Sequence, residues 1–154
     1  MRISFSTSVK SFCALAAIAL LAACSSGNGV QVNSDGSMKV QNNGGTAIVG
    51  GTSIPKDWPT DAPVYAGATV QYSMATNPAS GQPGSAVILQ TTDAADAVAT
   101  FYAKALKDNG WTVEGTMQAG GATIIGASKG DRAISVAIGS TDGQTTITIG
   151  VGKK

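Results

Sequence analysis

An apolar run near the start of the chain limits what its first part can become. Residues 1–10 contain two basic residues and no acidic one, and residues 11–23 are almost wholly Ala, Leu, Ile, Phe and Cys, ending in small side chains. This pattern is typical of a secretory signal peptide. The apolar run of about 12 residues is shorter than the roughly 20 that a membrane-spanning helix needs. We therefore expect residues 1–23 to be a cleaved signal peptide.

The four residues that close this run, Leu21-Ala22-Ala23-Cys24, resemble the lipobox of bacterial lipoproteins. The resemblance implies cleavage between Ala23 and Cys24, lipidation of the Cys24 thiol and acylation of the new N-terminus. A thiolate is the strongest nucleophile among ordinary side chains, which suits a cysteine to this role. Cys13 lacks the preceding apolar run and small residues. An ordinary signal peptide, with Cys24 playing no part, is the alternative.

The lipobox resemblance also implies a location. In that family the residue after the cysteine directs sorting, and Ser25 rather than Asp implies delivery to the outer membrane, in an organism that has one. The domain would then face the periplasm. In other organisms the protein would lie on the cell-membrane surface. The expected partner is the lipid bilayer, held through acylated Cys24. Two or three acyl chains make a stable anchor because each buried methylene contributes about 0.8 kcal/mol.

Composition excludes several classes of function. Removing Arg2 and Lys10 from the ten basic residues leaves eight, against nine acidic ones, so the mature net charge is about −1. With no basic excess to neutralise phosphates, we do not expect nucleic acid as a partner. Cys24 is the sole cysteine after residue 23, so no disulfide is expected and stability must come from one modest core.

Residues 24–53 are rich in Gly, Asn and Ser and contain no aromatic residue, a composition typical of linkers. We interpret them as a lipidated N-terminus and a flexible or weakly β tether, reaching roughly 30 Å as a random coil. Alternation at 30–32 and 38–40, on either side of Asp35-Gly36, predicts a small β-hairpin. Residues 47–49 favour a third short strand.

A proline-rich stretch at residues 54–63 marks the entry into a folded domain, residues 54–154. From Pro55 to Val70 the sequence follows the pattern Pro-x-Asp-Trp-Pro-x-Asp-x-Pro-x-Tyr-x-Gly-Ala-x-Val. This sequence pattern resembles that of a family of small, uncharacterised envelope lipoproteins of bacteria. The resemblance extends to Phe101-Tyr102 and Gly110-Trp111 and covers about residues 50–151. It implies a fold and a location but no activity.

One helix is expected, starting near a cap at Thr92 or Asp93 and stopping at Asn109-Gly110, with Asp96 in its first turn. Its apolar face is predicted to carry residues 98, 101, 102, 105 and 106. Strands are expected at 70–74 and 86–91, joined by a loop at 76–84, and at 111–118, 122–128, 132–139 and 145–151.

Alternation in the last two strands predicts one apolar sheet face, with Ile134, Val136 and Ile138 beside Ile147, Ile149 and Val151. The other face is expected to carry Arg132, Ser135, Thr146 and Thr148. The fold class that follows is α+β, with one helix packed on an antiparallel β-sheet in two layers.

The chain has no histidine, and Glu114 is its sole glutamate, so the commonest general base and transition-metal ligand are missing. We therefore expect no enzymatic activity. Ser53-Ile54-Pro55-Lys56 fits a Ser-x-x-Lys nucleophile motif, but without its partner motifs and in a proline-rich stretch. Residues 121–126 have the glycine spacing of a phosphate loop, but Ala127 replaces its lysine, and the segment indicates a strand.

Three groups of side chains are candidate binding residues. Trp58 and Tyr65 offer an aromatic platform for a glycan or peptide, or else they cover an open end of the core. Asp57 and Asp61 could share a calcium ion, but no oxygen-rich loop surrounds them, so neither a metal nor a cofactor is predicted. Scattered lysines, Lys153 and Lys154 among them, suit anionic headgroups or wall polymers, or are simply solvated.

The expected function is that of a membrane-anchored envelope lipoprotein whose non-enzymatic domain binds or braces another envelope protein or a wall polymer. The alternative is a periplasmic enzyme or enzyme inhibitor acting through surface loops, chiefly residues 76–84. A purely structural surface protein is a third. A pocket gathering Asp with Tyr or Lys would favour the enzyme, whereas a flat or apolar exposed patch would favour binding.

Overall fold

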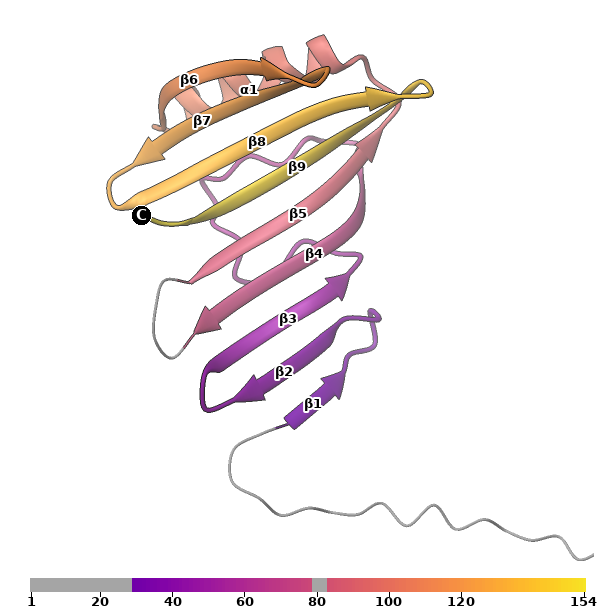
Figure 1. Cartoon of the computed structure of the whole chain (residues 1–154), viewed down its shortest axis with the longest axis vertical. Helices are drawn as coiled ribbons and strands as arrows, with labels where there is room; N and C mark the ends of the chain where they lie inside the picture. The colour runs from indigo at the N-terminus through magenta and orange to yellow at the C-terminus, as the bar shows by residue number, and fades with distance from the viewer. Residues whose placement is uncertain (1–28, 79–82) are drawn as a thin grey trace, which may run out of the picture.

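The structure, a computed structural model, describes residues 29–78 and 83–154 (Figure 1). The expected signal peptide and Cys24 lie outside the described residues, as does part of the loop expected at 76–84. The elements in chain order are β1 (Gly29–Val32), β2 (Met38–Asn42), β3 (Gly45–Gly51), β4 (Thr69–Pro78), β5 (Gly84–Thr91), α1 (Ala95–Asp108), β6 (Thr112–Ala119), β7 (Ala122–Lys129), β8 (Arg132–Thr141) and β9 (Gln144–Lys153).

All nine strands belong to one antiparallel sheet, in the order β1-β2-β3-β4-β5-β9-β8-β7-β6 (Figure 1). Most neighbours are hairpins, but β9, the last strand, lies between β5 and β8 and joins the two halves. The helix α1 lies against β6, β7 and β8, at one end of the sheet. Strands β1 to β4 extend well beyond it.

The expected two-layer α+β fold is therefore wrong. The molecule is mostly a nine-stranded antiparallel sheet, and its 14-residue helix covers one end of that sheet instead of forming a second layer over it. The prediction fails because it leaves residues 24–53 outside the fold, whereas β1, β2 and β3 continue the sheet from β4. Without β3, one edge of β4 would have unpaired backbone N–H and C=O groups. Such an edge can pair with alternating segments, even when they are rich in Gly and Asn.

The hairpin predicted around Asp35-Gly36 is present, with β1 and β2 paired from Val32 and Met38 outward. Its turn is held by the Asp35 carboxylate, whose Oδ1 accepts hydrogen bonds from the Ser37 backbone N–H at 3.0 Å and the Ser37 hydroxyl at 2.6 Å. Gly36 has φ of +80°, a left-handed conformation that glycine adopts without steric cost.

The helix packs as its periodicity predicts. Val98, Tyr102 and Leu106 are buried, and Phe101 and Ala105 are partly buried beside them. It starts one or two residues later than expected: the N-cap is Ala94, with no side-chain cap, so the predicted cap at Thr92 or Asp93 is wrong. Thr145 on β9 instead donates a hydrogen bond to the Asp93 carbonyl at 2.6 Å. Among the described residues, no helix is both long and apolar enough to cross a membrane.

The sheet has an inner face, toward α1, and an outer face. Ile134, Val136, Ile138, Ile147, Ile149 and Val151 are all buried on the inner face, as their alternation predicts. The placement of Arg132 on the opposite face is wrong. Its side chain shares the parity of Ile134 and reaches Asp61, on the connection between β3 and β4. That connection, residues 52–68, also packs against the inner-face core through Ile54, Trp58 and Val64.

Candidate functional site

A hollow opens on the inner face of the sheet, over strands β2 to β5, where α1 does not reach. It consists of two adjoining lobes of about 550 and 430 Å³ that share four lining residues: Lys39, Ile48, Asp57 and Ala75. Lys39 pairs with Ile48 across β2 and β3, and Ile48 pairs with Ala75 across β3 and β4. These three residues therefore form one transverse row along the floor.

The larger lobe extends this row toward the core. Ala75 pairs with Ser85 on β5 and Ser85 with Val151 on β9, and both also line the lobe. Asp57 and Pro59, from the 52–68 connection, form a wall, and Arg132 and Lys153 stand at the β8–β9 side. The lobe thus combines an apolar floor with basic groups at its margin.

The smaller lobe lies beside the β1–β2 turn and gathers several hydroxyl and carboxylate groups. It is lined by Asp35, Ser37, Ser53 and Ser73, among others. Ser37 and Ser73 are buried, and Ser53 donates a hydrogen bond to Asp35 Oδ2 at 3.3 Å. The hydrogen bonds from Ser37 hold the pKa of Asp35 below its ordinary value, so this carboxylate is a weaker base than a free aspartate.

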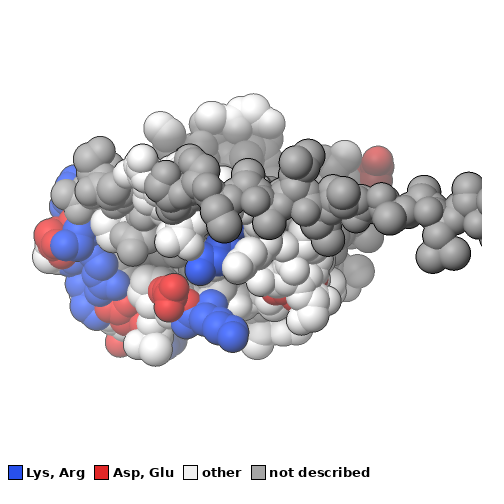
Figure 2. All heavy atoms as spheres, turned by 90° about the horizontal axis from the view of Figure 1, so that it is seen from below, with Lys and Arg blue, Asp and Glu red and all other residues white. Residues whose placement is uncertain are grey.

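The hollow carries more basic than acidic groups. Lys39, Lys56, Arg132 and Lys153 line one lobe or the other, against Asp35 and Asp57. None of the ion pairs between described residues involves Lys39 or Lys56, while Lys153 pairs with Asp131 at 3.4 Å. In Figure 2, which views the β1 end of the molecule, the charged side chains gather toward one side. An anionic group could therefore bind at Lys39 without displacing an existing partner.

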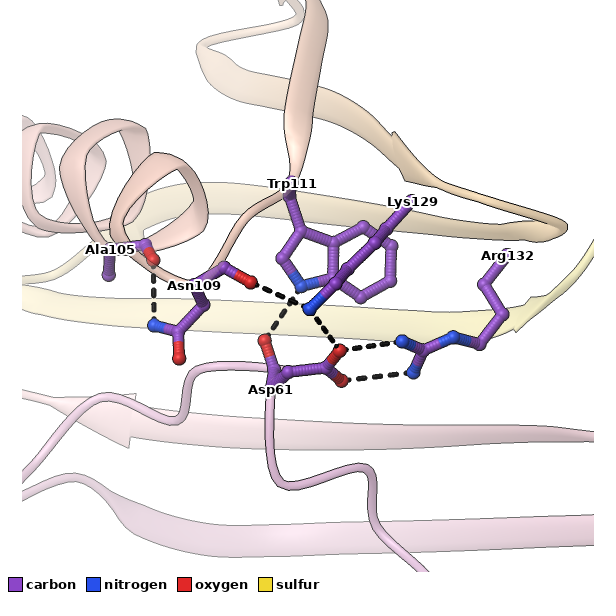
Figure 3. Close-up of polar contacts among 6 residues, drawn as sticks. All are labelled: Asp61, Ala105, Asn109, Trp111, Lys129 and Arg132. Carbon is purple, nitrogen blue, oxygen red and sulfur yellow. Dashed lines mark hydrogen bonds and ion pairs between the residues drawn. The ribbon is translucent and has the colours of Figure 1, made fainter.

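A polar cluster centred on Asp61 fastens the wall of the hollow to the rest of the fold (Figure 3). Arg132 donates to both carboxylate oxygens of Asp61, at 2.9 and 2.6 Å, and Lys129 donates to Oδ2 at 2.6 Å. The Trp111 indole N–H donates to the Asp61 backbone carbonyl at 2.7 Å, and the Arg132 guanidinium lies 5.1 Å from the Trp111 ring centroid.

The cluster joins four parts of the chain: the 52–68 connection, the end of α1, and strands β7 and β8. Lys129 also donates to the Asn109 carbonyl at 2.8 Å, at the C-terminus of α1. The Arg132 hydrogen bonds, followed by Lys129, hold the pKa of Asp61 well below its ordinary value, and Asp61 raises the pKa of Arg132. Because Asp57 and Pro59 lie only a few residues before Asp61, this cluster positions the wall that they form.

Trp58 and Tyr65, the predicted aromatic platform, pack against the core instead of lining the hollow. The Trp58 indole N–H donates to the Ala62 carbonyl at 2.9 Å. The Tyr65 hydroxyl donates to Asp93 at 2.7 Å, and its ring meets Phe101 edge-on at 5.0 Å between centroids. Both side chains remain partly exposed, and the structure does not bring them together with Lys39.

The other sequence motifs have structural explanations. Asp61 is occupied by Arg132 and Lys129, so it does not form a cation site with Asp57. Residues 121–126 enter strand β7, as their pattern indicates. The described residues contain no group of three or more candidate metal ligands. Sequence reasoning missed Lys39 and Ile48, although one signal was available: Lys39 is the one charged residue in strands β1 to β5.

Comparison with known proteins adds a family to this geometry. The family model described as START domain-like matches residues 70–146, from the start of β4 into β9, which is half of the chain. Searches of curated proteins and of solved structures found no significant match. The matched region contains α1, the centre of the sheet and the Arg132 side of the hollow. The chain therefore belongs to the START domain-like family.

Proposed function

We propose that this protein is a lipid-anchored envelope protein whose START domain-like fold binds a ligand without converting it. The observation that carries the proposal is the hollow over β2–β5, where an apolar floor at Ile48, Ala75 and Val151 meets the lysine at position 39. Ligand sites are typically concave and mostly apolar, with a few polar groups that set orientation.

The composition of the hollow favours an amphipathic anion. Its apolar part would cover the floor, where Ile48 and Ala75 are paired neighbours on β3 and β4. Its acidic group would meet Lys39, with Lys153 and Lys56 nearby on the margins. A long, flexible lysine suits an anion that approaches from solvent, since its ammonium is a point charge without a required direction.

The anchor belongs to the same proposal. Lipidation at Cys24, in the motif Leu21-Ala22-Ala23-Cys24, would hold the domain on the outer membrane, or on the cell membrane where no outer membrane exists. A non-enzymatic role is consistent with a chain that has no histidine and one glutamate. The mature charge near −1 argues against nucleic acid, while another envelope protein or a wall polymer could supply or receive the ligand.

Ligand binding can be tested with cis-parinaric acid, a fluorescent fatty acid with one carboxylate. Lys39→Glu should weaken its binding several-fold, because it replaces the attracting charge with a repelling one, and Ile48→Asn should do so by making the floor polar. Lys107→Glu makes the same charge change on an exposed residue of α1 outside the hollow and should leave binding unchanged. Equal affinities in all variants would refute the proposed site.

The anchor has its own test. Cells expressing the chain should incorporate labelled palmitate into the protein, and Cys24→Ala should abolish incorporation and release the protein from the membrane fraction. Cys13→Ala, which changes the other cysteine, should leave both results unaltered. Palmitate labelling that persists in Cys24→Ala would contradict lipidation at this residue.

An enzymatic role remains a second candidate because the smaller lobe gathers Asp35 with Ser37, Ser53 and Lys39. Against it, the lowered pKa of Asp35 makes that carboxylate a poor general base. Incubating the protein with envelope extracts and following products by mass spectrometry would distinguish the two roles. Product formation that Asp35→Asn abolishes would favour the enzyme.

A further inference from the structure

The exposed apolar side chains of this molecule share one face. Among the described residues, the large hydrophobic side chains that are most exposed are Val30 (66%), Val32 (73%), Met38 (45%), Tyr72 (38%) and Met117 (59%). Val32 pairs with Met38, and that row continues through Val49 to Met74, two residues from Tyr72 on β4. A second row of paired residues crosses the sheet from Tyr72 on β4 to Met117 on β6. It passes through Ile88, Thr148, Ala137 and Ile124. All five therefore lie on the outer face.

This outer face is also almost free of charge. Of the five charged residues in the nine described strands, Lys39, Lys129, Arg132 and Lys153 have the parity of the inner face. The fifth, Glu114, lies at the β-bulge in the edge strand β6. A sheet face in contact with water normally carries charged and polar residues, so a neutral, partly apolar one indicates a surface that binds something.

The β1–β4 end carries most of the exposed apolar surface. Val30, Val32, Met38 and Tyr72, which we call the docking face, lie there, and Met117 lies on β6 at the opposite end. Neighbouring strands rotate by roughly 20–25° relative to one another. The two ends of a nine-stranded sheet therefore cannot both lie flat on one planar surface.

The docking face includes β1, which is the described strand nearest along the chain to the proposed anchor. Cys24 precedes Gly29, the first residue of β1, by five residues, and a chain of that length spans at most roughly 18 Å when fully extended. A lipidated Cys24 would hold β1 within that distance of the bilayer. The random-coil reach of residues 24–53 does not apply, because β1, β2 and β3 take up most of that segment.

We infer that the docking face lies on the surface of the bilayer that holds Cys24, an inference that rests on the proposed lipidation. The valines and Met38 would enter the boundary between headgroups and acyl chains, where Tyr72 can place its ring in the apolar layer and its hydroxyl among headgroups. Strands β2, β3 and β4 have neighbours on both sides that pair their backbone groups, whereas the free edge of the edge strand β1 would have to lie among the hydrated headgroups. The hollow, on the inner face, then opens away from the membrane.

The test uses the lipidated protein, purified in detergent and reconstituted into phosphatidylcholine–phosphatidylglycerol vesicles with or without bromine on the lipid tails. Lipidation consumes the Cys24 thiol, so Val32→Cys supplies one free thiol for an environment-sensitive NBD label. Met117→Cys, on the same face at the far end, and Lys107→Cys, exposed on α1, are matched controls. Tyr72→Cys is a second test position should Val32→Cys fail to fold.

The label at residue 32 should shift to the blue and be quenched by brominated lipid several-fold more than the labels at residues 117 and 107. Vesicles that carry the protein but quench none of the labels would overturn docking while leaving the anchor intact. Protein that does not float with vesicles would overturn the anchor and, with it, this inference. A blue shift that grows with the density of protein on the vesicles, without quenching by brominated lipid, would show that the docking face binds a second copy of the chain. That result would also overturn the inference.

Discussion

Arg132 and Asp61, which lie 71 residues apart in sequence, form a bidentate ion pair with N–O distances of 2.9 and 2.6 Å. The pair connects strand β8 to the segment that forms the wall of the hollow, and the 52–68 connection has no strand pairing of its own to hold it there. Both side chains are about three-quarters buried, so solvent screens their interaction only in part. This relationship leads to two predictions about stability.

Asp61→Asn should lower the free energy of unfolding by about 1.5–3 kcal/mol, the range for partly buried hydrogen bonds to charged groups. The amide cannot neutralise Arg132 and Lys129, and it accepts through one oxygen instead of two. Urea denaturation followed by tryptophan fluorescence measures the change. Asp108→Asn is the control: it removes the exposed ion pair with Lys104 and should change stability by less than about 0.5 kcal/mol. Equal losses in the two variants would contradict the role of Asp61.

The pH dependence of stability should carry the signature of Asp61. Because its folded-state pKa is depressed below the usual 3.8, its contribution is fully present above about pH 4 to 5 and is lost as pH falls toward the lower folded value. The wild-type urea midpoint should therefore fall between pH 5 and pH 3. In Asp61→Asn this fall of the urea midpoint with pH should be missing, so the midpoints of wild type and variant should converge at low pH. Parallel curves would show that Asp61 does not supply the slope.

Tyr102 should be more sensitive to loss of its hydroxyl than Tyr65. The Tyr102 ring is fully buried, and its oxygen accepts a hydrogen bond from the Tyr65 backbone N–H at 3.1 Å. Tyr102→Phe leaves that N–H without its acceptor, which should cost about 1–3 kcal/mol. Tyr65→Phe removes the exposed bond to Asp93 and should cost less. Chemical denaturation of both variants checks the order, and a larger loss for Tyr65→Phe would contradict it.

Gly51 should tolerate a side chain poorly. A Cβ added there would lie 2.6 Å from the Ser73 hydroxyl oxygen and 3.4 Å from Ser37 Cβ, two residues that line the smaller lobe of the hollow. Gly51→Ala should therefore destabilise the fold by about 1–3 kcal/mol, as overpacking does. In Gly126→Ala, within strand β7, the new Cβ would meet open space, so stability should hold or rise slightly. Thermal unfolding of both variants tests this contrast, which equal effects would refute.

Much of the local structure follows from the sequence alone. The buried helix residues Val98, Tyr102 and Leu106, and the alternating isoleucines of β8, are confirmed because periodicity is a local property of the chain. The turn at Asp35-Gly36 is confirmed for the same reason: the hydrogen bonds that Ser37 forms with Asn33 and Asp35 join residues no more than four apart. The lipobox at Cys24 is equally local, but it lies outside the described residues and stays a prediction.

What the tertiary structure decided is where these pieces meet. The sequence determined an alternating hairpin after residue 28, but only pairing between β3 and β4 made it part of one sheet with the rest. Lys39 became a candidate binding residue because that pairing set it in a row with Ile48 and Ala75, two strands away. Arg132 lies on the inner face with Ile134, as strict alternation along β8 requires, so its predicted placement was wrong on local grounds; what the tertiary structure decided is its partner, Asp61, on a connection without a periodic pattern. Contacts between segments far apart in sequence depend on which edges and faces remain uncovered, and no local pattern records that.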